Sequence, residues 1–169
     1  MRRLGIDHGT KRVGLALSDE EGWMAHARDT WKRDDADALL ERLAAFVEAE
    51  EVGEIVVGLP LHLDGHEGAS ARRARRFSER LEQRTGLPVV LWDERMTSAA
   101  AERSLRDAGV KAKDQKGLVD QVAAALLLQS YLDSLRARED RWDGPDAGAA
   151  SATPSAPDEA ADDEPSSGR

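Results

Sequence analysis

Three carboxylates stand where a folded chain could bring them together around a metal ion. Asp7 follows the apolar residues 4–6, Glu94 comes shortly after an apolar run at 87–92, and Asp120 stands near the start of the apolar segment LVDQVAAALLL. Buried acids repel one another unless a cation neutralises them. Oxygen ligands alone select a hard ion, Mg²⁺ or Mn²⁺, which polarises a phosphoryl oxygen and activates water for attack. The three acids therefore predict metal-dependent hydrolysis of a phosphodiester bond.

Each acid also has a purely structural interpretation. Asp7 precedes a glycine and could accept backbone N–H groups in a turn. Glu94, with Asp93 beside it, could belong to a solvated charge cluster that caps the next helix. Asp120 lies in the first turn of a predicted helix, where the helix dipole favours a negative charge. The catalytic interpretation requires the three side chains to converge. The arrangement of the strands and helices that carry them therefore decides between the catalytic and the structural interpretation.

Basic residues adjoin two of these acids. Lys11 and Arg12 follow Asp7 across a predicted turn, and Arg95 follows Glu94 directly. A cation beside a metal site suits a bound phosphate, so these three are the candidate substrate-binding residues, with charge balancing as the alternative. Other cations could track a nucleic-acid backbone or simply solvate a surface. They are Arg72, Arg73, Arg75, Arg76, Arg80 and Arg84 in a predicted helix, and Lys111, Lys113 and Lys116 in a predicted loop.

The elements that position these residues alternate between helix and strand after an initial hairpin. We expect strands at 4–6, 13–17, 25–31, 54–59 and 87–92, helices at 34–51, 70–85, 97–108 and 118–135, and a basic loop at 109–117. This order predicts an α/β fold with a mixed sheet and helices on both faces. If the strands that end at Asp7 and Glu94 are parallel neighbours, both acids emerge at the edge where open α/β sheets bind ligands.

The composition fits one domain followed by an acidic tail. The chain has 169 residues, enough for a single domain with a sizeable core. Residues 139–169 contain nine acidic residues and two arginines, so they carry −7 of the formal net charge of −9. They are also rich in Gly, Pro, Ala and Ser, which predicts a disordered tail after a domain at 1–138. Residues 1–138 are therefore close to neutral, which is compatible with a local basic face that binds nucleic acid.

Composition also argues against several classes of protein. The chain has no cysteine, which excludes a disulfide framework and a thiolate metal site. The longest apolar run, residues 122–128, is too short to span a membrane, and the N-terminal apolar stretch is too short for a signal peptide. We therefore expect a soluble cytoplasmic protein.

Four sequence blocks resemble those of one family. They stand in order as GIDHGTKRVGLALSD at 5–19, VVGLPLHLDGHEG at 56–68, LWDERMTSAAAE at 91–102 and VDQVAAALLLQSYLD at 119–133. Together they are similar to the YqgF (RuvX) family of pre-16S ribosomal RNA nucleases, which are related to Holliday-junction resolvases. The resemblance implies an RNase H-like fold, with a mixed five-stranded sheet flanked by helices on both faces. It also implies a metal-dependent nuclease that matures the 5′ end of small-subunit ribosomal RNA.

The resemblance assigns catalytic and metal-binding roles only at matching positions. Asp7 matches the aspartate of the family's first strand, Glu94 the glutamate of its DER block, and Asp120 the aspartate that opens its last helix. Many RNase H-like enzymes use a fourth carboxylate, but the last block offers only one acid near its start. Asp93, His8 or water are left to fill that position.

Other functions remain open. A ribosome-assembly factor could keep the fold and bind RNA without cutting it, although a binder has no need for a buried acid cluster. The substrate could instead be a branched DNA junction. An actin-like ATPase or sugar kinase is the remote alternative, because residues 7–10 resemble the first phosphate loop of that superfamily. Those proteins close two such domains over a nucleotide, whereas this chain is long enough for one. The sequence does not fix endo- or exonuclease action or the oligomeric state.

Overall fold

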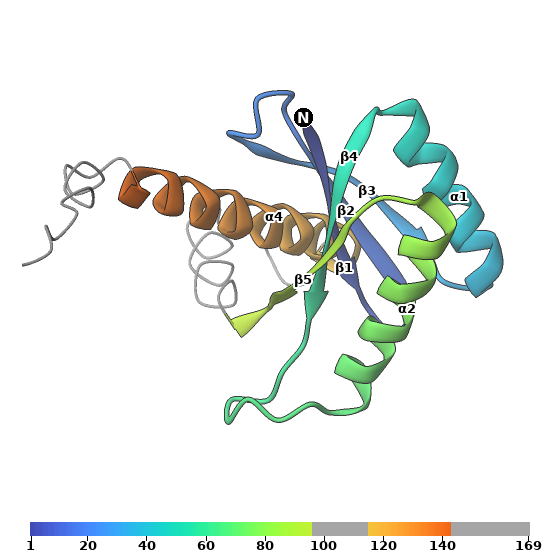
Figure 1. The fold of residues 1–169 in the computed structure, drawn as a ribbon. Coiled ribbons are helices and arrows are strands. Elements are labelled where there is room, and N and C mark those ends of the chain that lie inside the picture. The colour runs from blue at the N-terminus through green and yellow to red at the C-terminus, as the bar shows by residue number, and fades with distance from the viewer. Residues whose placement is uncertain (96–114, 143–169) are drawn as a thin grey trace, which may run out of the picture.

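The structure is a computed structural model that describes residues 1–95 and 115–142 (Figure 1). Its elements are β1 (Arg2–His8), β2 (Arg12–Ser18), β3 (Ala25–Lys32), α1 (Ala36–Ala49), β4 (Val52–Leu59), α2 (Ala69–Thr85), β5 (Val89–Asp93) and α4 (Gln115–Trp142). All of these except α4 begin and end within two residues of the predicted bounds. The helix predicted at 97–108 and residues 143–169 of the predicted tail lie outside the described residues. Residues 139–142, predicted as the start of the disordered tail, belong instead to α4.

The five strands form one mixed sheet in the order β3-β2-β1-β4-β5, which confirms the predicted α/β fold. The first three strands form an antiparallel meander, whereas β4 pairs parallel to β1, and β5 pairs parallel to β4. Parallel strands need crossover connections, and α1 and α2 provide them before β4 and β5. Because β1, β4 and β5 run in the same direction, their carboxyl ends meet at one edge of the sheet.

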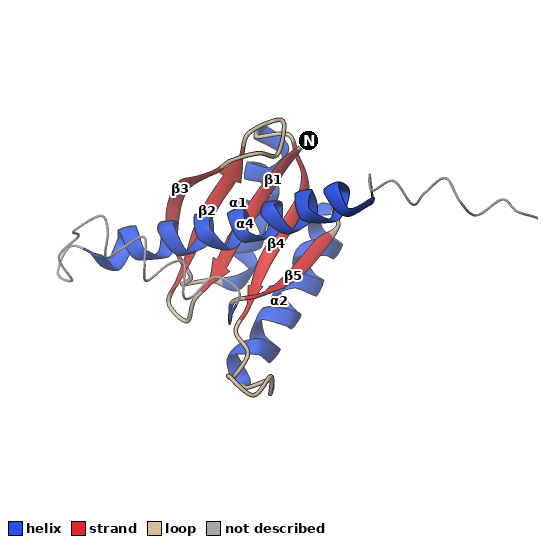
Figure 2. Ribbon diagram, turned by 90° about the vertical axis from the view of Figure 1, so that its left-hand side faces the viewer, coloured by secondary structure: helices blue, strands red, loops and turns tan. Residues whose placement is uncertain are grey.

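Helices cover both faces of the sheet, as predicted. Figure 2 shows α4 lying across one face, with α1 and α2 on the other. The contacts agree, because α4 packs on β1, β2 and β3, while α2 packs on β4 and β5. Strand side chains alternate between two cores. Ile6 of β1 belongs to the core under α1 and α2, whereas Val56 of β4 packs with Ala124 and Leu128 of α4. The face that a strand residue occupies follows from this alternation.

The last helix is longer than the sequence analysis predicts. It begins at Gln115 and ends at Trp142, whereas the predicted bounds were 118 and 135. The prediction of a loop as far as residue 117 is therefore wrong. Gly117 suggested a break, but a single glycine costs only about 1 kcal/mol inside a helix and need not end it. At the other end, residues 136–142 contain no glycine or proline that would stop the helix.

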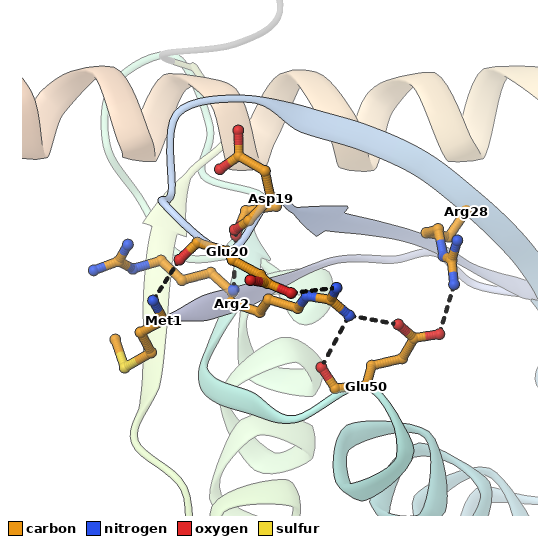
Figure 3. A network of polar contacts seen from close by, with 8 residues as sticks. Met1, Arg2, Asp19, Glu20, Arg28 and Glu50 are labelled. Atoms are coloured by element: carbon orange, nitrogen blue, oxygen red, sulfur yellow. Dashed lines mark hydrogen bonds and ion pairs between the residues drawn. The ribbon is translucent and has the colours of Figure 1, made fainter.

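A network of polar contacts holds the amino end of β1 (Figure 3). Arg2 donates to Oε1 of Glu20 and Oε2 of Glu50, both at 3.1 Å, and Arg28 donates to Oε1 of Glu50 at 2.5 Å. The N-terminal ammonium of Met1 donates to the carbonyl of Glu20 at 2.5 Å. Such partly exposed ion pairs contribute at most about 1 kcal/mol each. At this end of β1, each arginine in the network has a carboxylate partner.

Candidate active site

Asp7 lies near the carboxyl end of β1, with its side chain on the α4 face of the sheet. Alternation along the strand places it there. Ile6 packs in the core under α1 and α2, while a Cβ added to Gly5 would lie 2.7 Å from Cβ of Leu128 in α4. Burial and, to a smaller extent, the negative charge of Asp120 raise the pKa of Asp7 to about 6. Asp7 is therefore a half-buried acid that has a second acid close to it.

The backbone of Asp120 rests on β2 at Gly14. Gly14 is the register partner of Asp7 in the antiparallel β1–β2 pair. A Cβ added to Gly14 would lie 2.0 Å from the carbonyl oxygen of Asp120. Only glycine allows a helix backbone to approach a strand this closely. The close approach brings Asp120 to the position on the sheet that Asp7 occupies.

Asp120 is the sixth residue of α4, so the prediction that it lies in the first turn is wrong. The effect of the helix dipole falls off within the first turn, which removes the dipole explanation for this acid. Its partner is Arg12, whose Nε lies 3.0 Å from Oδ2 of Asp120. That oxygen is buried, and despite the ion pair it accepts no hydrogen bond from the described residues. Its charge is therefore only partly compensated.

Glu94 follows β5, and its side chain lies over β4. Its Oε1 would be 2.5 Å from a Cβ added to Gly58 of β4. Gly58 lies on the α4 face, because the same added Cβ would come 2.7 Å from Cδ1 of Leu127. Burial raises the pKa of Glu94 to about 7, with smaller contributions from the charges of Asp7 and Asp93.

The structure thus brings Asp7, Glu94 and Asp120 to one face of the sheet at its carboxyl edge, and we call these three residues the acid site. The strands of Asp7 and Glu94 are not neighbours, because β4 lies between β1 and β5. Gly58 carries no side chain that would separate the two acids across β4. Asp7 is electrostatically coupled to both of the others, since Asp120 raises the pKa of Asp7 and Asp7 raises that of Glu94.

The acid site suits a divalent cation chemically. As the side chains stand, no three His, Cys, Asp or Glu residues in the described part of the chain form a group that could hold an ion. Two observations nevertheless indicate a need for positive charge. The charge of Asp120 raises the pKa of Asp7 and the charge of Asp7 raises that of Glu94, and Oδ2 of Asp120 is buried without a hydrogen bond. A donor set made only of carboxylate oxygens fits Mg²⁺ or Mn²⁺.

His8 is not placed to act as a fourth ligand. It follows Asp7 on β1 and therefore points to the opposite face, where its ring stacks on Phe77 with 4.2 Å between ring centroids. Burial, followed by the charges of Arg33 and Arg73, lowers the pKa of His8 to about 4. The suggestion that His8 could complete the metal site is wrong, because neighbouring residues of a strand point to opposite faces.

Asp93 and Arg95 form a pair at the end of β5. Nε of Arg95 lies 3.0 Å from Oδ1 and 2.8 Å from Oδ2 of Asp93, and Nη2 lies 2.5 Å from Oδ2. The hydrogen bonds from the guanidinium lower the pKa of Asp93. Asp93 is thus engaged by a cation and is not directed to the acid site, and Arg95 has the charge-balancing arrangement that was the alternative to phosphate binding.

Lys11 and Arg12 line a basic groove of about 500 Å³ that the sequence analysis identified only in part. Lys32 and Arg33 line the same groove. Lys32 is the register partner of Arg12 in the β2–β3 pair, and the backbone N–H of Arg33 donates to the carbonyl of Lys11 at 3.0 Å. The predicted third strand at 25–31 was the signal that could have found them, because its antiparallel pairing with the second strand brings residues 32–33 alongside residues 11–12.

Half of the arginines that were predicted to form a basic helix face are paired with acids. The pairs are Arg75 with Glu67, Arg80 with Asp37, and Arg84 with Glu41. Arg73 and Arg76 instead line a cleft that contains His8. Lys111, Lys113 and the side chain of Lys116 lie outside the described part of the chain.

Residues 1–134 match a family model described as "RuvX: Holliday junction resolvase". The chain belongs to the RuvX family. Relatives from Halalkalibacterium halodurans and Anaeromyxobacter sp. are 45% and 47% identical to it, and both are named "Putative pre-16S rRNA nuclease". The alignments cover 79% and 81% of this chain and 96% and 100% of those relatives. The RuvX chain is therefore a nuclease-family protein, a hydrolase that acts on ester bonds.

Solved structures of two resolvases share the fold of this RuvX chain. Thermus thermophilus RuvC, in complex with a Holliday junction substrate, is 19% identical with a TM-score of 0.54, and the match covers 83% of this chain and 96% of that one. The fowlpox virus Holliday junction resolvase is 14% identical with a TM-score of 0.50, over 80% of this chain and 99% of that one. These similarities confirm the RNase H-like architecture.

Membership in the RuvX family also bears on the alternatives. It places the chain among nucleases and so argues against an actin-like ATPase or a sugar kinase.

Proposed function

We propose that this RuvX-family chain is a divalent-metal-dependent nuclease that cleaves precursor 16S ribosomal RNA during maturation of its 5′ end. In this proposal Asp7, Glu94 and Asp120 hold the ion, Mg²⁺ or Mn²⁺, and form the catalytic centre. The observation that carries it is the coupling of Asp7 to both other acids on one face of the sheet. The name that relatives at 45% and 47% identity share supports the proposed substrate.

The chain's own residues prepare this centre. With pKa values of about 6 and about 7, Asp7 is mostly ionised and Glu94 is about half ionised at neutral pH, and a cation held by these residues would favour the ionised forms. Gly14 and Gly58 provide the space for Asp120 and Glu94 next to Asp7. When bound, the ion supplies a polarised phosphoryl oxygen and an activated water for in-line attack.

Arg12 connects the acid site to the path of the substrate. It pairs with Asp120 and also lines the basic groove beside Lys11. We assign Lys11 and Arg12 to binding the substrate phosphates, because a guanidinium fork and an ammonium next to a metal site hold phosphate well. Arg95, which Asp93 engages, is assigned to charge balance.

The cytoplasm is the proposed place of action, because it is where bacterial ribosomal RNA precursors are made and processed. None of the helices in the described ranges is long and apolar enough to cross a membrane.

A cleavage assay tests the proposal. The purified full chain is incubated with Mg²⁺, Mn²⁺ or a chelator and one of three substrates: 16S RNA with its 5′ extension, an unrelated single-stranded RNA of equal length, and a four-way DNA junction. We expect cleavage within the 5′ extension in either metal and none in the chelator. Preferential cutting of the junction would make the chain a resolvase. Tight binding of the precursor without any cut would make it a non-catalytic assembly factor.

A further inference from the structure

A second basic cleft lies on the face of the sheet opposite the acid site. It has a volume of about 340 Å³ and lies between the end of β1, the start of α1 and the first half of α2. We call it the His8 cleft. Its lining includes the stacked rings of His8 and Phe77 and four arginines, Arg33, Arg73, Arg76 and Arg80. No acidic residue of the described ranges lines it.

Three of these arginines have no carboxylate partner in the described part of the chain. Arg33 donates to the carbonyl of Gly9 at 2.9 Å, and Arg73 donates to Oγ of Ser70 at 2.8 Å. Both acceptors are neutral, so they leave the positive charge in place. Arg76 forms no ion pair with a described residue. The cleft therefore concentrates positive charge in a concave surface, which favours an anionic ligand.

Several arginines outside the cleft have carboxylate partners. On the same helix, Arg75 and Arg84 pair with Glu67 and Glu41. At the amino end of β1, Arg2 pairs with two glutamates (Figure 3). On α2, Arg75, Arg80 and Arg84 are thus paired with acids and Arg72 donates to the backbone carbonyl of Glu67, whereas three of the four arginines of the His8 cleft have no carboxylate partner among the described residues.

The His8 cleft is continuous with the proposed catalytic centre around the end of β1. Arg33 lines both the cleft and the basic groove. Arg12 lines the groove and pairs with Asp120 of the acid site. Asp7 and His8 are consecutive residues whose side chains occupy opposite faces, so the two sites share one strand end. A polyanion that follows these cations passes from one face of the sheet to the other.

We propose that the His8 cleft binds a backbone phosphate of the RNA substrate, outside the bond that is cut. The inference rests on the proposed function and adds the route of the substrate strand. A strand that reaches both sites must bend round the edge of the sheet. Single-stranded RNA bends in this way, whereas a nucleic-acid duplex is stiff over many base pairs. The cleft therefore selects a single-stranded segment next to the cleavage site.

The test measures RNA binding in chelator, where the proposed nuclease does not cut. A short fluorescein-labelled single-stranded RNA is titrated with the wild-type full chain at several salt concentrations. The double variant Arg73→Gln/Arg76→Gln removes two charges from the cleft, and the matched control Arg75→Gln/Arg84→Gln removes two charges from the same helix outside it. We expect the slope of log affinity against log salt to fall by about 0.7 for each lost phosphate contact in the cleft variant only. The charge-preserving Arg73→Lys/Arg76→Lys should keep most of the wild-type slope.

Each result decides the matter. Equal slopes for the cleft variant and its control would overturn the inference while leaving the nuclease proposal intact. A blunt RNA duplex should show no difference between cleft variant and control, and an equal loss with duplex would overturn the route round the sheet edge. If the wild-type chain binds RNA with a salt slope that depends on the cleft but cuts no RNA in the presence of metal, the nuclease proposal is overturned. The phosphate-binding role of the His8 cleft would then stand. Absence of RNA binding by the wild type would overturn both.

Discussion

Gly14 and Asp120 are in contact through their backbones. A Cβ added to Gly14 would lie 2.0 Å from the carbonyl oxygen of Asp120 and 3.2 Å from its Cα. Since Gly14 is also the register partner of Asp7, this contact, together with the close approach of α4 to Gly5, brings α4 close to the sheet and places two acids together. The geometry of the proposed catalytic centre therefore depends on a residue that has no side chain.

Gly14→Ala is expected to displace α4 from β2. Overpacking of this kind costs about 1–3 kcal/mol of unfolding free energy, and cleavage should fall even under conditions where the variant is folded. Denaturant melts and single-turnover cleavage measure the two effects. Gly53→Ala is the matched control, because its added Cβ would meet only the flexible side chain of Met1. If the two variants lost the same small amount of stability and kept full cleavage, the role assigned to Gly14 would be wrong.

Glu94→Gln and Asp120→Asn are each expected to abolish metal-dependent cleavage without unfolding the protein. The double variant should be no worse than either single one, because ligands of one metal centre act as a unit. Asp93→Asn is the control acid at the same edge, and it should retain most of the activity because Asp93 is engaged by Arg95. Near wild-type turnover for Glu94→Gln or Asp120→Asn would remove that residue from the site.

Asp7 and Glu94 should each destabilise the metal-free protein progressively as pH rises from about 4 to about 7. His8 acts in the opposite direction over this range, because burial lowers its pKa from 6.5 to about 4, so substitution of a single acid is needed to isolate the effect. Burial and neighbouring acids raise the pKa of Asp7 from 3.8 to about 6 and that of Glu94 from 4.5 to about 7. The folded state therefore binds these protons more tightly than the unfolded state, and deprotonation favours unfolding. The Asp7→Asn variant lacks the contribution of Asp7 to this loss of stability. In chelator the variant should therefore melt at a higher temperature than wild type at pH 8, and the difference in melting temperature should shrink at pH 4.

Asp19→Asn provides a control of opposite sign. Hydrogen bonds from backbone N–H groups, that of Trp23 first, lower the pKa of Asp19, so its contribution is present at neutral pH and is lost as pH falls. Asp19→Asn should therefore melt lower than wild type at pH 8. Melting curves for Asp7→Asn that ran below wild type at pH 8 in chelator would show that Asp7 is not under electrostatic strain.

A chain that ends at Trp142 is expected to fold and to cut. Residues 143–169 contain seven acidic residues and one arginine, and a tethered polyanion competes with RNA for a basic surface. Removal should raise RNA affinity at low salt, and the gain should fade as salt screens the charges. A full-length chain with these acids replaced by Asn and Gln should show the same gain. Loss of cooperative unfolding on truncation would instead give the tail a structural role.

The sequence was sufficient for Asp7 and Glu94 because both follow apolar strands, and carboxyl ends of parallel strands share an edge. It was not sufficient for the order of the strands. β4 lies between β1 and β5, and only the absence of a side chain at Gly58 allows Glu94 to lie on the same face as Asp7 without obstruction. Strand order and such local space depend on tertiary packing, which short-range periodicity does not encode.

The positions and partners of Asp120 and the basic residues also depend on tertiary structure that short-range sequence patterns do not encode. The predicted first-turn position of Asp120 was wrong because α4 begins at Gln115 and continues through Gly117, since one glycine inside a helix costs only about 1 kcal/mol. The pairing of Arg12 with Asp120 and of Arg95 with Asp93 depends on side-chain geometry. Lys32 and Arg33 were accessible in principle, because the strands at 13–17 and 25–31 were both predicted and their antiparallel pairing in the structure places Lys32 opposite Arg12.

The most direct test of the central claim is the single-turnover rate at which wild type and Asp7→Asn cleave 5′-extended 16S precursor RNA in saturating Mg²⁺ or Mn²⁺ at pH 8. Asp7 is the acid coupled to both other members of the acid site, and asparagine keeps its shape while removing its charge. We predict metal-dependent cleavage by wild type and a rate lower by on the order of 10³-fold or more for Asp7→Asn. Cleavage by Asp7→Asn at the wild-type rate, or by wild type in chelator, would contradict the account.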